Sequence, residues 1–189
     1  MFRSGKSVYL RPLGSGDLPF LLDLDNDPAV NEFFVHHRPV TLDVAKKRLE
    51  KRLLDEGNNV YLGIAFIEKS DLLGSINLHR VDLVHGTAWV EVKIDVRWWG
   101  KGCGYEAIMI LLNYAFNQLN LRKVCWGTLG SNAKGIRCAQ KCGFTEDGRM
   151  KGQFQRGGSL IDDVYLSVFR ENWLPVWGKY QQGLPHIVP

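Results

Sequence analysis

Residues 90–116 read VEVKIDVRWWGKGCGYEAIMILLNYAF and carry the strongest structural signal in the chain. Residues 90–96 alternate β-branched and polar side chains, which is typical of a strand with one buried face. The glycine-rich sequence GKGCG follows at 100–104, and apolar residues then recur at helical spacing from Ala107 to Leu119. The stretch predicts a strand, a glycine-rich loop and a long buried helix in immediate succession.

The glycine-rich loop has the features of an anion site. Gly100, Gly102 and Gly104 permit positive φ angles and close approach, and the first helical turn leaves amide N–H groups without partners. The helix dipole also favours negative charge there, so a pyrophosphate group is a suitable ligand. The P-loop requires four residues between its glycines, and the dinucleotide fingerprint places its third glycine one residue later, in a parallel βαβ unit. The spacing therefore disfavours a P-loop nucleotide triphosphatase and a dinucleotide-binding protein.

Hydrophobic periodicity divides the rest of the chain into further elements. The expected strands cover residues 7–11, 60–67, 72–81, 87–96 and 123–129, with a final hairpin at 145–155 and 160–169. The expected helices run from 15 or 17 to 24, from 41 to 57, from 102 to 119 and from 133 to 141. Short turn signals separate the three strands between 60 and 96, which predicts an antiparallel meander, whereas the segment 26–39 reads as irregular.

Length and composition suit one domain of the α/β or α+β class, since 45% of the 189 residues are hydrophobic. We expect this domain to span residues 1–174, and residues 175–189 to form a C-terminal tail on its surface. The net charge of +4 is too small to imply nucleic-acid binding, and no apolar stretch approaches the roughly 20 residues that cross a membrane. Four cysteines without CxxC spacing and the lack of a signal-peptide pattern favour a cytoplasmic protein with reduced thiols and no metal site.

The string WWGKGCGYEAIMILLNYAF resembles motif A of the GNAT superfamily of N-acetyltransferases, in which an Arg or Gln precedes the glycines that wrap the coenzyme A pyrophosphate. Trp99 stands in the place of that Arg or Gln. Further strings resemble the RimJ/RimL branch, the ribosomal-protein N-acetyltransferase type, and follow in order over residues 8–173: VYLRPLGSGDLPFLLDLDNDPAV, LNLRKV, SNAKGIRCAQKCGFTEDG and DDVYLSVFRENW. The resemblance implies the GNAT fold, a mixed and mostly antiparallel central sheet that is splayed at the cofactor strand and flanked by helices.

The resemblance also implies a cofactor, acetyl-CoA, and transfer of its acetyl group to a primary amine by direct attack in a ternary complex. The acceptor would be a protein N-terminus or a small amine. The pantetheine arm would pair with the backbone of Ile94, Asp95 and Val96, and the pyrophosphate would bind amides of Trp99, Gly100, Lys101, Gly102, Cys103, Gly104 and Tyr105. Asn132 would contact pantetheine while it caps the following helix.

The catalytic acid and base are not apparent from the resemblance. Ala139, Gly135 and Phe154 occupy the positions of the family's Tyr, Ser and Glu. The favoured interpretation is catalysis by positioning and oxyanion stabilisation from backbone amides, with water as a proton relay, because a thiolate can leave without a dedicated acid. A second is that Glu91 acts as the base, with a solvated strand face or an ion pair with Lys93 as the alternatives for this residue. A third is an acyl-CoA-binding module that does not catalyse a reaction.

The acceptor site is the least determined part of the sequence. The segment 26–39 and the turn at Gly157 and Gly158 are expected to line it, with His36, His37 and Asp163 as candidate substrate-binding residues. Cys103 opens a helix, which is expected to lower its pKa. The aromatic C-terminal tail makes a homodimer plausible, and no nucleic-acid or membrane partner is expected.

Overall fold

The computed structural model describes residues 3–35, 38–69 and 71–183. These residues form one eight-stranded sheet in the order β1-β2-β3-β4-β5-β6-β8-β7. Its strands are β1 (Arg3–Ser4), β2 (Val8–Pro12), β3 (Val60–Phe66), β4 (Leu72–Asp82), β5 (Thr87–Ile94), β6 (Lys123–Leu129), β7 (Thr145–Arg156) and β8 (Ser159–Phe169). The helices are α1 (Leu18–Asn26), α2 (Pro28–Asn31), α3 (Leu42–Leu53), α4 (Cys103–Asn117), α5 (Ala133–Lys141) and α6 (Arg170–Gln182), with 3-10 turns η1 (Ser15–Asp17) and η2 (Val96–Trp98).

The sheet is antiparallel except where β5 meets β6. β3, β4 and β5 form the predicted antiparallel meander. The parallel register joins 87–89 of β5 to 123–125 of β6, whereas β6 stays paired with β8 as far as Leu129. Within the described residues, β5 and β6 therefore separate beyond Trp89 and Cys125, and the predicted splay of the sheet is confirmed.

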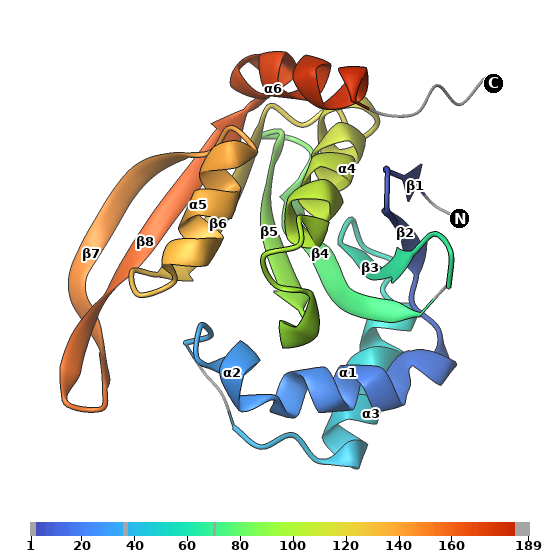
Figure 1. The fold of residues 1–189 in the computed structure, drawn as a ribbon, viewed down its shortest axis with the longest axis vertical. Coiled ribbons are helices and arrows are strands. Elements are labelled where there is room, and N and C mark those ends of the chain that lie inside the picture. The colour runs from blue at the N-terminus through green and yellow to red at the C-terminus, as the bar shows by residue number, and fades with distance from the viewer. Residues whose placement is uncertain (1–2, 36–37, 70, 184–189) are drawn as a thin grey trace.

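The two faces of the sheet carry different helices. α4 packs with the main core, whose strand residues include Leu62, Val90 and Val92, and α5 lies beside it (Figure 1). Side chains alternate along a strand, so Tyr61 faces the opposite way from Leu62. Tyr61 packs there against a second, smaller core that includes Leu21 of α1 and Leu49 of α3.

The long helix α4 is buried as its periodicity predicts. Ten of its fifteen residues are buried, and Ala107, Ile108, Leu111 and Phe116 are completely covered. Burying a large apolar side chain contributes about 1.5–3 kcal/mol, so α4 fixes the centre of the domain. The position of its first turn, at the glycine-rich loop, follows from this packing.

The expectation of a surface tail is wrong for residues 175–182, because they continue α6. Trp173 and Tyr180 are buried on one side of this helix, and the Trp173 ring lies 5.2 Å from that of Phe116 and 5.1 Å from that of Trp177. Aromatic residues at helical spacing thus pack α6 onto α4, across the top of Figure 1, although Pro175 suggests a break. Residues 184–189 lie outside the described residues.

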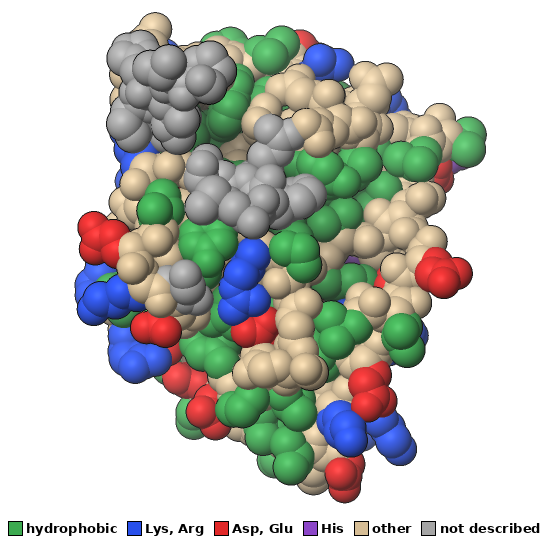
Figure 2. Space-filling view, turned by 90° about the vertical axis from the view of Figure 1, so that its right-hand side faces the viewer, with side chains coloured by type: hydrophobic (Ala, Val, Ile, Leu, Met, Phe, Trp, Pro, Cys, Tyr) green, Lys and Arg blue, Asp and Glu red, His purple; other side chains and the backbone are tan. Residues whose placement is uncertain are grey.

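Two short elements were not expected. β1 pairs with β2 at the edge of the sheet. The segment 26–39 was expected to be irregular, but it contains α2, which Asp27 caps by accepting hydrogen bonds from the amides of Ala29 and Val30. On the face shown in Figure 2, acidic and basic side chains lie next to each other at the margins, in line with the small net charge.

Buried Glu106 connects α4 to the N-terminal strands. Its Oε1 accepts hydrogen bonds from the amides of Ser7 at 2.8 Å and Val8 at 3.3 Å. We expect Glu106→Ala to lower the free energy of unfolding by about 2–3 kcal/mol, because two amides lose their acceptor. Urea denaturation measures this. Glu171→Ala, at an exposed position of α6, is the control and should cost less than about 1 kcal/mol; equal losses would contradict the role of Glu106.

Candidate active site

The loop before α4 presents an open row of amide groups. Gly100 and Gly102 have φ angles of +74° and +85°, and a Cβ added at either glycine would meet no atom within 4 Å. Within the described chain, the amide N–H groups of residues 100–105 donate to no other residue. A helix N-terminus with free amides and open space in front of it fits a phosphate group.

The amide of Trp99 does not belong to this row, because it donates to the carbonyl of Val96 at 3.2 Å. Trp99 contributes through its side chain instead. The indole Nε1–H donates to the carbonyl of Ile94 at 2.7 Å, and the ring lies 5.7 Å from the ring of Phe33. The candidate phosphate site therefore runs from Gly100 to Tyr105.

The backbone of Ile94, Asp95 and Val96 is already engaged within the chain. The amide of Asp95 donates to Leu73, and the carbonyls of Asp95 and Val96 accept from the amides of Trp98 and Trp99. The Asp95 carboxylate accepts from the amide and guanidinium of Arg97, which lowers its pKa. Pairing of pantetheine with this segment stays a prediction, and it requires these carbonyls to accept a second hydrogen bond or to exchange partners.

Asn132 caps α5, as expected. Its Oδ1 accepts from the amide of Gly135 at 3.0 Å, and its Nδ2 donates to Thr128 Oγ1 at 3.0 Å. A Cβ at Gly135 would lie 2.4 Å from Asn132 Nδ2, so a Ser at this position would displace the cap. Contact between Asn132 and pantetheine stays a prediction.

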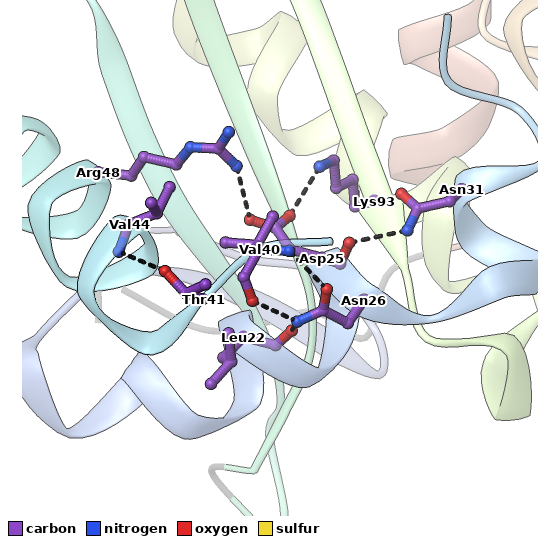
Figure 3. A network of polar contacts seen from close by, with 9 residues as sticks. All are labelled: Leu22, Asp25, Asn26, Asn31, Val40, Thr41, Val44, Arg48 and Lys93. Carbon is purple, nitrogen blue, oxygen red and sulfur yellow. Dashed lines mark hydrogen bonds and ion pairs between the residues drawn. The ribbon is translucent and has the colours of Figure 1, made fainter. Parts of the chain in front are cut away.

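The Glu91 carboxylate forms no ion pair with the neighbouring Lys93. Figure 3 shows Lys93 turned toward α1, where its Nζ lies 2.8 Å from Asp25 Oδ1, and Arg48 reaches the same carboxylate at 3.7 Å. Within the described residues, the Glu91 side chain forms no hydrogen bond or ion pair, and its charge acts on His79, where it partly offsets the lowering of the His79 pKa by burial. The pairing of Glu91 with Lys93 that the sequence left open is therefore wrong, whereas the role of Glu91 as a base stays a prediction.

Register places Glu91 where the sheet opens. Trp89 pairs with Cys125 in the parallel register. Two residues further along both strands, Glu91 is therefore level with Gly127, which pairs with Tyr165 of β8. A Cβ at Gly127 would lie 3.5 Å from the Trp89 ring and 4.0 Å from the Tyr165 ring. These two aromatic side chains, with ring centroids 6.1 Å apart, thus lie on the Glu91 face of the sheet.

Asp163 belongs to the same group. It lies two residues before Tyr165 on β8, so both side chains share a face, and the Tyr165 hydroxyl donates to Asp163 Oδ2 at 2.6 Å. This hydrogen bond raises the pKa of Tyr165. The face therefore combines two carboxylates, Asp163 and Glu91, with two aromatic rings.

The loop after α2 and the β7–β8 hairpin close one side of this region. The Arg156 guanidinium donates to the carbonyls of Glu32 and Phe34, and the Phe34 ring lies 4.5 Å from Lys93 Nζ. The segment 26–39 and the hairpin also line one cavity of about 490 Å³, formed by Asn26, Pro28, Asn31, Glu32, Arg38, Pro39 and Arg156. The segment 26–39 thus contacts the hairpin through Arg156, but that these segments line the acceptor site stays a prediction, and His36 and His37 lie outside the described residues.

The expected low pKa of Cys103 is wrong. Cys103 is buried, and burial raises the pKa of its thiol, with a smaller contribution from the Glu106 carboxylate. The effect of burial on the pKa of this thiol therefore outweighs the effect of the helix N-terminus. The structure also contains no helix that could span a membrane and no group of three or more metal-ligating side chains among its described residues.

Several residues of this region were not predicted from sequence. Lys134 Nζ lies 5.7 Å from the centroid of the Trp99 ring, and Arg80 stacks over Trp89. Trp89 lies two residues before Glu91, and Tyr165 lies two residues after Asp163, so each follows the alternation of one sheet face. This spacing is the sequence signal that could have identified them. Arg156 and Lys134 carry no such signal, because their partners lie far away in the chain.

Comparison with known proteins agrees with the geometry. The sequence profile of the acetyltransferase (GNAT) domain matches residues 7–145. The chain is 26% identical over 171 residues to spermidine N(1)-acetyltransferase of Escherichia coli (strain K12), with 90% of each protein covered. The putative ribosomal N-acetyltransferase YdaF of Bacillus subtilis (strain 168) is 29% identical over 116 residues, which cover 61% of this chain and 62% of YdaF.

Solved structures show the same fold. Spermidine N-acetyltransferase from Vibrio cholerae, in complex with CoA and spermine, gives a TM-score of 0.80 at 24% identity and covers 88% of this chain and 98% of that one. A putative acetyltransferase from T. thermophilus gives 0.78 at 26% identity and covers 97% and 96%. The RimJ/RimL resemblance stays a prediction. Because the family profile covers most of the sequence and the fold agrees, the chain belongs to the GNAT family of N-acetyltransferases, which use acetyl-CoA as the acetyl donor.

Proposed function

We propose that this enzyme acetylates the amine of a small cationic molecule and that Glu91 is the base. The observation that carries the proposal is the position of Glu91, which forms no ion pair within the described residues and lies where β5 and β6 separate. Asp163 adds a second carboxylate, and the Tyr165 ring adds an aromatic face that attracts cations, whereas the Trp89 ring already carries Arg80. The named spermidine acetyltransferases among the relatives support a small amine over a protein N-terminus.

In the proposed reaction, different residues bind the cofactor, accept the proton and bind the acceptor. The free amides of 100–105 fit the paired phosphates of acetyl-CoA and would hold them at the start of α4. Acetyl-CoA supplies an acetyl thioester, whose carbonyl carbon bonds to the amine nitrogen as the C–S bond breaks; the proton that the acylated nitrogen then loses goes to the leaving thiolate, directly or through water. Glu91 accepts the proton that the ammonium group must lose before the nitrogen can attack, either directly or through water. Asp163 binds a second positive charge of the acceptor.

A second candidate function is an acyl-CoA-binding module without catalysis. It is favoured by the absence of side-chain catalysts at Ala139, Gly135 and Phe154. Calorimetry with CoA and a thiol-release assay separate the two candidates. The assay should include polyamines, aminoglycosides, amino sugars and peptides. We expect release of the CoA thiol with a small polycation; CoA binding without thiol release with any acceptor would favour the module.

The four free cysteines support a cytoplasmic location.

Asp163→Asn tests how the acceptor is recognised. We expect KM for a diamine or polyamine acceptor to rise about fivefold to tenfold, because one ion pair with the acceptor is lost while the amide oxygen still accepts from Tyr165. The rate at saturation and KM for a monoamine should change less than about twofold. Asp43→Asn, at an exposed position of α3, is the control. An equal rise for monoamine and diamine would contradict recognition of a second charge by Asp163.

A further inference from the structure

Lys134 occupies an electrostatically unfavourable position. It lies in the first turn of α5, which contains no acidic residue. The positive end of a helix dipole disfavours a cation there. Its ammonium group forms no hydrogen bond or ion pair within the described part of the chain. Lys134 is exposed and lies beside the positive ends of two helices, so its ammonium group is available to an anion that binds there.

Trp99 fixes the direction of this lysine. Lys134 Nζ lies 5.7 Å from the centroid of the Trp99 ring, close enough for a cation–π interaction. The indole itself is anchored, since its N–H donates to the carbonyl of Ile94. Trp99 directly precedes the row of free amides from Gly100 to Tyr105. The Lys134 ammonium is therefore held beside the candidate phosphate site by a different helix from the one that supplies the amides.

A second lysine is arranged in the same way. Lys101 Nζ lies 4.4 Å from the centroid of the Trp98 ring, one residue before Gly102. The two adjacent tryptophans thus each carry a lysine, one from the loop and one from α5. Lys101 belongs to the glycine loop itself, so Lys134 is the cation of this pair that comes from outside the loop.

We propose that Lys134, stacked on Trp99, binds the pyrophosphate of coenzyme A and supplies positive charge to it from outside the glycine loop. Trp99 is then a positioning residue, and Lys134 is a binding residue. The inference rests on acetyl-CoA as the donor but not on the identity of the acceptor. The adenosine 3′-phosphate is another phosphate of the same molecule, and a ligand that lacks it distinguishes the two sources.

The test is isothermal titration calorimetry of the full chain with CoA and with 3′-dephospho-CoA, each at two NaCl concentrations. We expect Lys134→Gln to raise both Kd values about fivefold to thirtyfold, because a charged hydrogen bond to phosphate is lost. Both Kd values of this variant should also depend less on the NaCl concentration than those of the wild type, because the variant lacks one exposed ion pair that salt would screen. Lys134→Arg should retain most of the affinity and the salt dependence.

Lys141→Gln is the matched control, because Lys141 is an exposed lysine in the last turn of the same helix. It should leave both Kd values within about twofold of the wild type. Trp99→Ala should also raise the Kd for CoA. Lys134→Gln should raise this Kd by a smaller factor in the Trp99→Ala variant than in the wild type. An unchanged Kd in Lys134→Gln, an equal loss in Lys141→Gln, or a loss for CoA but not for 3′-dephospho-CoA would overturn the assignment. Failure of the wild type to bind CoA would instead contradict the donor.

Discussion

Gly102→Val is expected to raise the Kd for CoA at least thirtyfold. Gly102 has φ +85°, a left-handed conformation that costs a non-glycine residue about 1–2 kcal/mol and a β-branched residue more. The added side chain would also stand within the row of free amides, at a point with no other atom within 4 Å. Strain and obstruction therefore both act on the phosphate site. Calorimetry with CoA measures the loss.

Gly158→Val separates these two effects. Gly158 has φ +80° and, like Gly102, no atom within 4 Å of an added Cβ, but it lies in the turn between β7 and β8. The substitution should destabilise the fold by a similar amount and leave the Kd for CoA within about twofold of the wild type. If Gly102→Val also kept its affinity for CoA, the phosphates would bind elsewhere.

Glu91→Gln is expected to lower kcat about 10²-fold to 10⁴-fold, the usual range for the contribution of a general base. Gln keeps the size of the side chain and removes its ability to accept a proton. The Kd for CoA should stay within about twofold, because Glu91 lies on a sheet face and not in the glycine loop. Steady-state kinetics with a saturating amine measures kcat, and calorimetry measures Kd.

The control for this substitution is Glu171→Gln, which changes an exposed glutamate on α6. It should leave both quantities unaltered. A kcat of Glu91→Gln within about twofold of the wild type would contradict the role of Glu91 as base. It would support instead the interpretation that positioning and a water relay suffice, since a coenzyme A thiolate leaves without a dedicated acid.

The main elements of the fold were predictable because they depend on local pattern. α5 has the predicted limits of 133–141, and β6 has those of 123–129. α6 was not predicted, because Pro175 and Gly178 suggest an irregular segment. The burial of Trp173 and Tyr180 against the rest of the domain outweighs that local preference.

The site was predictable only where one continuous segment forms it. The glycine loop is such a segment, and its free amides are those expected, apart from that of Trp99. Lys134 reaches the loop from another helix, and Lys93 is removed from Glu91 by Asp25, which lies 68 residues earlier in the chain. Contacts between distant segments decide which cations and carboxylates remain free, and periodicity contains no information about them.

The most direct test of the phosphate site is a CoA titration followed by ¹⁵N–¹H NMR of the backbone amides. The glycine amides at 100, 102 and 104 should shift strongly and saturate with the calorimetric Kd, since a phosphate oxygen would accept hydrogen bonds from this row. The glycine at 86, which lies at the opposite end of β5 from this loop, serves as the internal reference. Saturable binding of CoA that left the amides of residues 100–105 unshifted would contradict the account.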